Sequence, residues 1–193
     1  MAAIDAGTDA LGLNFWPEGP RFLAPADAPR VIRAARERAP QVELVGVFVD
    51  VPVGEVRALR ARLGLDAVQL HGRETPADVE ALQPGAYKAI GIEGPEDIAR
   101  AAAYPGPRIL LDARVPGGPP GGTGARFDWA LAGRLAQERV LLLAGGLTPA
   151  NVAEAVRRVR PHMVDVASGV ETAPGVKDAE AMRAFVRAAK AAP

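Results

Sequence analysis

The sequence predicts an α/β protein with a parallel sheet, of the (β/α)8-barrel type, in which the first strand is missing from the chain. Seven short apolar runs alternate with helix-like stretches, and such alternation is typical of successive βαβ units. The chain opens on a helix-like segment, Met1–Ala6, with no strand before it. Seven strands and eight helical stretches fit an eightfold barrel without strand 1, folded as a single domain over residues 1–193.

The apolar runs are four to seven residues long and rich in Val, Ile and Leu. Continuous apolar runs of this length suit strands that are buried on both faces, as in parallel sheets. In chain order the expected strands are Ala10–Phe15, Glu43–Val49, Asp66–Leu70, Tyr87–Ile92, Arg108–Leu111, Arg139–Ala144 and Met163–Ala167.

Helices are expected between these runs, and proline marks several of their starts. Thr75-Pro76 and Thr148-Pro149 each offer an N-cap hydroxyl followed by proline at the first helical position. Apolar residues recur at helical spacing in three further stretches, which we expect to pack on the sheet: Asp27–Ala39, Gly54–Leu63 and Asp178–Ala191.

Composition excludes several function classes. Lys and Arg together number 23, as do Asp and Glu, and no block of one sign occurs, which argues against nucleic acid or an anionic membrane surface as a partner. The sequence has no cysteine and only two histidines, so we expect no metal site. No apolar run approaches the ~18 residues of a membrane span, and the N-terminus has no signal-peptide pattern. We therefore expect a protein of the cytoplasm.

Two glycine-containing turns predict a phosphate site. Residues 143–149 read LAGGLTP, so Gly145 and Gly146 end an apolar strand shortly before a helix. The next strand is followed by Ser168 and Gly169. Backbone amides in such turns can approach an anion closely, and the last two strand ends of a barrel are a common phosphate site. The alternative is a pair of tight turns that merely need glycine.

Three further residues near strand ends could take part in chemistry. Asp112 ends a buried strand, where desolvation can favour the protonated form that a general acid needs; its alternative role is a helix cap or an ion-pair partner. His71 ends another strand and could contact a ligand or simply satisfy a loop carbonyl. Arg21 lies in the loop after the first run, and its guanidinium would suit a carboxylate, although a lone arginine is usually a solvated surface residue.

The longest low-complexity segment is Val115–Gly124, with the sequence VPGGPPGGTG. It follows the strand that ends near Asp112 and precedes an expected helix near Asp128. A loop of this length inside a compact domain is usually functional, so we expect a lid.

Taken together and in order, the motifs resemble those of the phosphoribosylanthranilate isomerases of tryptophan biosynthesis. The resemblance runs nearly from end to end and is specific because several motifs recur at the family's spacing. Its main segments are Gly7–Phe22, Val45–Val49, Ala67–Gly72, Leu110–Asp112, Gly121–Trp129, Leu143–Val152, Val164–Glu171 and Pro174–Asp178.

The resemblance implies a TIM barrel that performs an Amadori rearrangement of N-(5-phosphoribosyl)anthranilate. A general acid opens the ribose ring to a Schiff base, and a general base then removes the C2 proton to give an aminoketose. By position, Asp112 matches the acid and Arg21 the residue that holds the anthranilate carboxylate. His71 and Asp165 match positions near the ligand, and the phosphate turns match Gly145, Gly146, Ser168 and Gly169. The only partner implied is this small-molecule substrate, and no cofactor is implied because both steps are proton transfers.

The sequence departs from the family at the general base. The family uses a cysteine at the end of its first strand, and this sequence has neither the cysteine nor that strand. We expect that the cause is a start site placed too far downstream, or a truncated chain. The competing hypothesis is a catalytically inactive barrel that still binds a sugar phosphate. A third possibility, another phosphate-binding barrel enzyme, is disfavoured by the segments Gln69–Gly72 and Pro20-Arg21.

Overall fold

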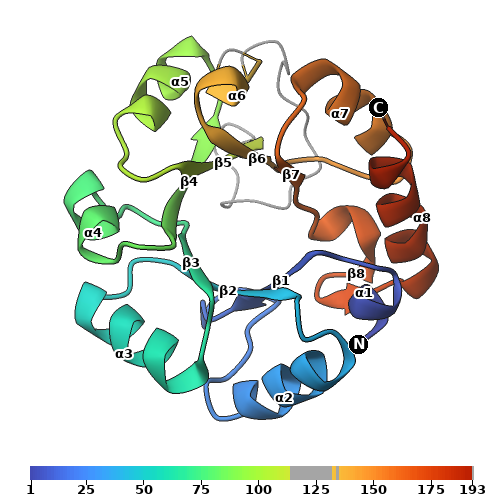
Figure 1. Ribbon diagram of the computed structural model, residues 1–193, viewed down its shortest axis with the longest axis horizontal. Coiled ribbons are helices and arrows are strands. Elements are labelled where there is room, and N and C mark those ends of the chain that lie inside the picture. The colour runs from blue at the N-terminus through green and yellow to red at the C-terminus, as the bar shows by residue number, and fades with distance from the viewer. Residues whose placement is uncertain (114–131, 134, 193) are drawn as a thin grey trace.

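The computed structural model describes residues 1–113, 132–133 and 135–192. Its seven-stranded sheet follows the chain in the order β1 to β7, and each strand pairs in parallel with the next. Seen along the barrel axis, the sheet curls around the centre and the helices lie outside it (Figure 1). The predicted fold class is therefore confirmed. The strands are β1 Ala10–Asn14, β2 Glu43–Phe48, β3 Ala67–Leu70, β4 Ala86–Ile92, β5 Arg108–Ala113, β6 Val140–Leu143 and β7 Met163–Val164.

All seven predicted runs form strands, and most of their ends shift by only one or two residues. The last run is the exception, because only Met163–Val164 of the predicted Met163–Ala167 is a strand. The amide of Asp165 still donates to the Leu143 carbonyl, after which the chain turns into the 3-10 helix η2, Ser168–Val170. A short antiparallel pair follows, formed by β8 (Glu171–Ala173) and β9 (Val176–Lys177).

The helices largely match their predicted positions. A capping box between Thr75 and Asp78 starts α4 as expected. The start predicted at Thr148-Pro149 is wrong, because the Asn151 side chain accepts a hydrogen bond from the Thr148 amide and holds these residues in a turn before the helix. The helices are α1 Ala2–Asp5, α2 Ala28–Arg38, α3 Val53–Leu63, α4 Pro76–Ala81, α5 Pro95–Ala102, α6 Leu135–Glu138, α7 Val152–Val159 and α8 Ala179–Lys190.

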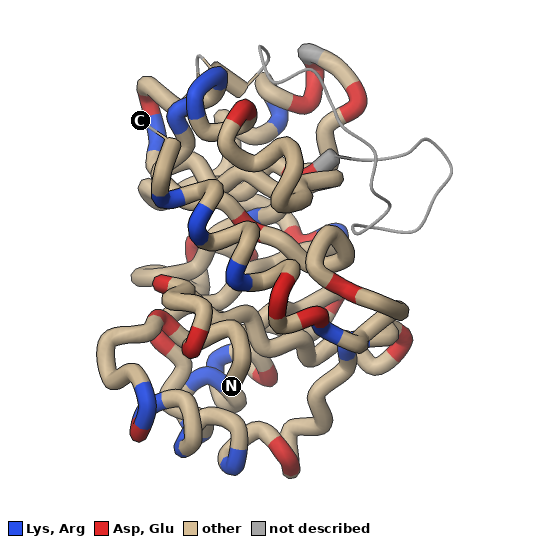
Figure 2. The backbone as a smooth tube through the Cα atoms, turned by 90° about the vertical axis from the view of Figure 1, so that its right-hand side faces the viewer, with Lys and Arg blue, Asp and Glu red and all other residues tan. Residues whose placement is uncertain are grey.

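None of the described helices has both the length and the apolar character needed to cross a membrane. Acidic and basic residues are mixed along the chain (Figure 2).

Alternate residues of each strand belong to two separate cores. One set packs outward against the helices, as Leu44 and Phe48 do from β2 and Ile109 and Leu111 do from β5. The other set fills the interior of the barrel, where the buried residues are Val45, Ala67, Tyr87, Ala89, Leu110, Leu142 and Ala144. This period of two places inward side chains at the strand ends in the same enclosed space.

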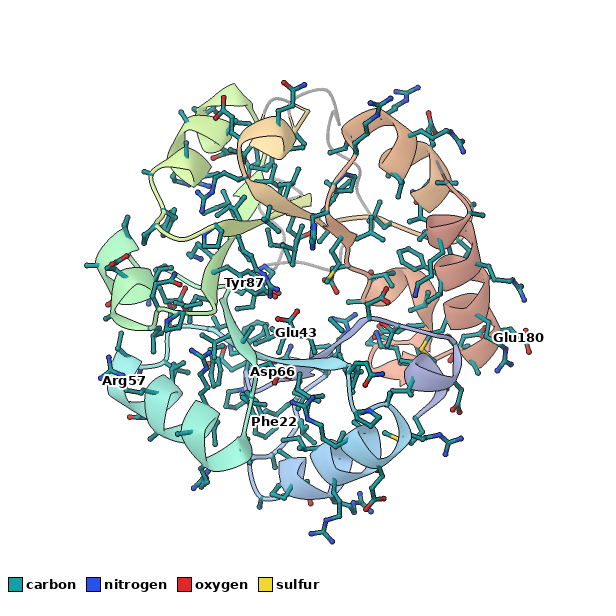
Figure 3. The ribbon with its side chains drawn as sticks, in the orientation of Figure 1. Phe22, Glu43, Arg57, Asp66, Tyr87 and Glu180 are labelled. Atoms are coloured by element: carbon teal, nitrogen blue, oxygen red, sulfur yellow. The ribbon has the colours of Figure 1, made fainter. Side chains whose placement is uncertain are left out.

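A charged pair lies in the interior at the N-terminal end of the strands. Glu43 begins β2 and Arg108 begins β5, and their side chains form an ion pair across the barrel. Glu43 and Tyr87 both reach toward the middle of the barrel (Figure 3). The pair joins the starts of β2 and β5 at the end of the barrel opposite to the strand ends.

The sheet does not close on itself within the described residues, since β1 and β7 are its two edges. The helical layer is nevertheless continuous there, because α1 packs beside α8 (Figure 1). Ala2, Ala3 and Ala6 contact the core cluster that contains Met182 and Phe185 of α8. Lys190 at the end of α8 also forms an ion pair with Asp9, directly before β1.

The free edge of β1 predicts self-association. The amides of Glu43 and Phe15 bond to the carbonyls of Asp9 and Val47, so the backbone of Gly12 faces away from β2. An exposed strand edge is a template for pairing with another chain. We expect concentration-dependent dimers in sedimentation velocity, and Gly12→Pro should shift them toward monomer by removing one donor. Gly54→Ala is the control, since a Cβ there meets nothing. A chain that stays monomeric at every concentration would contradict this expectation.

Candidate active site

Three of the predicted site residues lie together at the C-terminal end of the barrel. Asp112 is near the end of β5, His71 directly follows β3, and Asp165 directly follows β7. Asp112 is buried, and its Oδ2 lies 3.4 Å from Nε2 of His71. A carboxyl group and an imidazole at this distance can exchange or share a proton with a ligand that lies between the strand ends.

Two polar side chains in the barrel interior, connected by hydrogen bonds, orient His71. The Gln69 amide nitrogen lies 3.0 Å from Nδ1 of His71, and the Tyr87 hydroxyl donates to the Gln69 amide oxygen at 3.4 Å. The Gln69 amide thus contacts the Nδ1 side of the ring, and Nε2 on the other side faces Asp112. Burial raises the pKa of Tyr87, with a contribution from the nearby charge of Asp165, so its hydroxyl keeps its proton.

Asp165 and Asp112 interact as like charges. Although Asp165 remains accessible to solvent, the protein that surrounds it in the barrel mouth desolvates the carboxyl and raises its pKa, and the charge of Asp112 raises it further. Lys177 and His71 oppose this shift. A carboxyl group whose pKa is raised in this way is suited to holding a proton at the site.

Arg21 reaches the same end of the barrel from the loop after β1. Its Nε and Nη2 atoms each donate to a carboxylate oxygen of Glu171 at 2.7 Å. This hydrogen-bonded pairing raises the pKa of Arg21, and Asp165 contributes to the shift. Arg21 is therefore not a solvated surface residue; it is a fixed cation near Asp165.

The two glycine turns that were predicted to bind phosphate are in contact. Gly145 and Gly146 both have positive φ values, of 90° and 61°, which favour glycine. A Cβ on Gly169 would lie 1.8 Å from the Leu147 carbonyl oxygen, so only glycine fits there. Ser168 begins η2 beside it. The turns after β6 and β7 thus meet at one place, ahead of α7, where backbone amides can receive an anion.

A buried ion pair supports the loop that carries His71. Lys88 lies on the outward face of β4, and its ammonium is 3.3 Å from the Glu74 carboxylate. It also donates to the carbonyls of Leu70 and Gly72, the two neighbours of His71, at 3.1 and 2.8 Å. Burial lowers the pKa of Lys88 while the charge of Glu74 raises it. Glu74 in turn accepts from the amide of Gly72 at 2.8 Å.

Sequence reasoning assigned no role to three residues of this arrangement: Gln69, Lys88 and Glu171. Only Gln69 carried a usable signal, because it lies two positions before His71 and therefore shares its face of the strand. Lys88 and Glu171 carried no such signal, because Glu74 and Arg21, with which they pair, lie on other elements of the fold. The predicted lid, Val115–Gly124, and the helix expected near Asp128 lie outside the described residues. Within the described ranges, no group of three His, Asp or Glu side chains could hold a metal ion.

The raised pKa of Asp165 predicts a dependence of stability on pH. Between the ordinary pKa of 3.8 and the higher pKa of the folded state, Asp165 is protonated more in the folded state than in the unfolded state. The free energy of unfolding therefore falls as the pH rises through this range. We expect Asp165→Asn to stabilise the protein at pH 7.5 and to lose that advantage at pH 3.5, measured by urea unfolding. Asp27→Asn is the control, because Asp27 is exposed and makes no capping bond. An equal effect of Asp165→Asn at both pH values would contradict the argument.

Comparison with known proteins identifies the family of this chain. A family model described as "N-(5'phosphoribosyl)anthranilate (PRA) isomerase" matches residues 1–188. A protein of this name from Myxococcus xanthus is 51% identical over 98% of this chain and 90% of its own length. One from Geobacter sp. strain M21 is 46% identical over 98% and 91%.

Solved structures of phosphoribosyl anthranilate isomerases also match this chain. The crystal structure of phosphoribosyl anthranilate isomerase from Thermotoga maritima matches with a TM-score of 0.87 and 38% identity, covering 98% of this chain and 91% of that one. A second structure of such an enzyme, in complex with reduced 1-(o-carboxyphenylamino)-1-deoxyribulose 5-phosphate, matches with a TM-score of 0.83 and 35% identity over 98% and 91%. The chain described here belongs to the N-(5'-phosphoribosyl)anthranilate isomerase family.

Proposed function

We propose that this protein isomerises N-(5'-phosphoribosyl)anthranilate to 1-(2-carboxyphenylamino)-1-deoxyribulose 5-phosphate in tryptophan biosynthesis, in the cytoplasm. Family membership supports the reaction, and one feature of the structure carries its assignment to this site. Asp112 is a buried carboxyl group at the strand ends, in contact with His71 and in electrostatic contact with Asp165. A site for general acid–base chemistry needs titratable groups held together in this way.

In the proposed reaction, Asp112 donates a proton to the ribose ring oxygen. The C1–O bond then breaks and the nitrogen lone pair forms a Schiff base with C1. A general base, which the resemblance assigns to a cysteine on the family's first strand, takes the proton from C2 to give an enolamine. The enolamine then gains a proton at C1 and loses the proton of its C2 hydroxyl to give the aminoketose. His71, oriented by Gln69, contacts the ligand beside Asp112, and Asp165 completes the set of groups that can hold protons.

The two charged ends of the substrate have separate partners in this proposal. The phosphate binds at Gly145, Gly146, Ser168 and Gly169, where two turns meet. The anthranilate carboxylate binds Arg21, which reaches the site from the opposite edge of the sheet. Holding the substrate at both ends fixes the reacting carbons between them, next to Asp112.

A second candidate function is a barrel that binds the sugar phosphate without turning it over. The observation behind it is that residues 1–193 contain no cysteine, whereas the resemblance assigns the general base to a cysteine on the family's first strand. Retention of Asp112 and Arg21 favours the isomerase, since binding of phosphate alone uses neither.

Catalysis and binding are separable by one substitution. We expect isomerase activity when a strand carrying the family's cysteine is added before Met1, and little activity without it. In the extended protein, Asp112→Asn should lower kcat by about 10²–10⁴-fold, because asparagine keeps the shape of Asp112 but cannot donate the acid's proton. The measurements are fluorescence kinetics for turnover and calorimetry for binding of the reduced product. Full activity of Asp112→Asn would refute the assignment, whereas binding without turnover in the extended protein would support the inactive barrel.

The phosphate assignment has its own test. Gly146→Ala should weaken binding of ribose 5-phosphate by roughly tenfold, since ~1.4 kcal/mol corresponds to one order of magnitude and a side chain both strains this left-handed turn and crowds the amides. Ser168→Ala should act in the same direction without changing the backbone. Gly54→Ala is the matched control, because a Cβ at Gly54 meets nothing. Unchanged affinity in both site variants would place the phosphate elsewhere.

A further inference from the structure

The side chain of Arg21 is held by residues from the opposite edge of the sheet. Glu171 accepts two hydrogen bonds from one edge of the Arg21 guanidinium, at 2.7 Å each. The two residues are 150 positions apart in sequence, and the Glu171 side chain is only 4% exposed. A bidentate pair of this kind fixes both the position and the plane of the guanidinium.

Lys177 completes the cluster from β9. Its ammonium lies 2.8 Å from Oε1 of Glu171 and donates to the Ala167 carbonyl at 2.7 Å. Burial acts to raise the pKa of Glu171, but the hydrogen bonds from Arg21 and Lys177 outweigh it and lower the pKa to about 2. Glu171 therefore stays ionised, and the cluster of Arg21, Glu171 and Lys177 carries one net positive charge.

The loops that carry these residues are packed together. Glu171 and Lys177 are directly paired across β8 and β9. The turn between them passes so close to the loop after β1 that a Cβ on Gly175 would lie 2.5 Å from the Pro20 carbonyl oxygen. The cluster is thus fixed by backbone contact as well as by charge, and it joins the loops that follow the two edge strands β1 and β7.

The pairing leaves one edge of the guanidinium for a ligand. Nε and one N–H of Nη2 are used by Glu171, so Nη1 and the second N–H of Nη2 form the remaining edge, and Nη1 makes no hydrogen bond within the described part of the chain. Two parallel N–H donors match a carboxylate. The net positive charge of the cluster favours an anion at that edge, although Glu171 neutralises part of the charge on Arg21.

We infer that Glu171 is a positioning residue for the substrate carboxylate: it holds Arg21 so that the free edge of the guanidinium faces the ligand, and Lys177 keeps the cluster cationic. This inference rests on the proposed function, in which Arg21 binds the anthranilate carboxylate. Its consequence is specific. Loss of Glu171 lowers affinity only for ligands that carry the ring carboxylate.

The test compares two ligands by calorimetry at pH 7.5. One is reduced 1-(o-carboxyphenylamino)-1-deoxyribulose 5-phosphate, and the other is the same molecule without the ring carboxyl group. The unsubstituted protein should bind the first at least tenfold more tightly. Arg21→Ala should abolish that preference. Glu171→Gln should reduce it at least fivefold while leaving affinity for the second ligand unchanged, and Glu171→Asp should restore part of it.

Two further variants keep the test decisive. Glu180→Gln is the matched control, because Glu180 points outward from α8 and is paired with Arg183 (Figure 3). Lys177→Met removes the second cation while keeping the Arg21–Glu171 pair. It should therefore also lower the preference for the ligand that carries the ring carboxylate. If Glu171→Gln does not fold, the affinities of Lys177→Met for the two ligands test the inference instead.

Each outcome has one meaning. An equal loss of affinity for both ligands in Glu171→Gln would make Glu171 merely structural and overturn the inference. An unchanged preference in Glu171→Gln or, if that variant is unfolded, in Lys177→Met would overturn it as well, while Arg21→Ala still supported the proposed function. An unchanged preference in Arg21→Ala would instead remove the carboxylate role of Arg21 itself.

Discussion

Successive side chains of a strand point to opposite faces, and in this barrel that constraint decides which residues reach the site. On β5, Ile109 and Leu111 pack outward against the helices, which forces Leu110 and Asp112 inward. The same packing on β3 turns Gln69 toward the interior while Val68 and Leu70 face the helices. The outer hydrophobic layer therefore fixes the inward position of Asp112 and Gln69, although it touches no ligand.

The alternation of side chains along a strand does not fix the positions of residues in the loops. For the loop that carries His71, a buried pair of charged side chains fixes the backbone. His71 lies just beyond β3, and its backbone neighbours are held by Lys88 and Glu74 behind the sheet. Both charges are buried, so neither tolerates loss of the other: breaking such a pair typically costs about 3–5 kcal/mol. The hydrogen bonds of Lys88 and Glu74 hold the backbone on both sides of His71.

The two edges of the sheet are joined in a different way from the other strands. Between β1 and β7 there is no ladder within the described residues, and the connections are side-chain and helix contacts. In the helical layer α1 packs on α8, and at the candidate site Arg21 forms an ion pair with Glu171. Arg21, the predicted carboxylate-binding residue, thus follows edge strand β1, and its partner Glu171 follows edge strand β7. The geometry of the site therefore depends on how these two edges of the sheet are held together.

Local patterns in the sequence were enough to predict the architecture of this protein and to name Asp112, His71, Asp165 and Arg21 as candidate site residues. Apolar runs separated by proline- and glycine-marked turns are local signals, and they located all seven strands and the residues at their ends. The sequence could not show which of those residues meet, because burial and charge pairing between distant positions leave no local pattern. Only the folded chain shows that Glu171 fixes Arg21, that Lys88 supports the loop of His71, and that burial and the charge of Asp112 raise the pKa of Asp165. Each of these depends on neighbours that the curl of the sheet brings together.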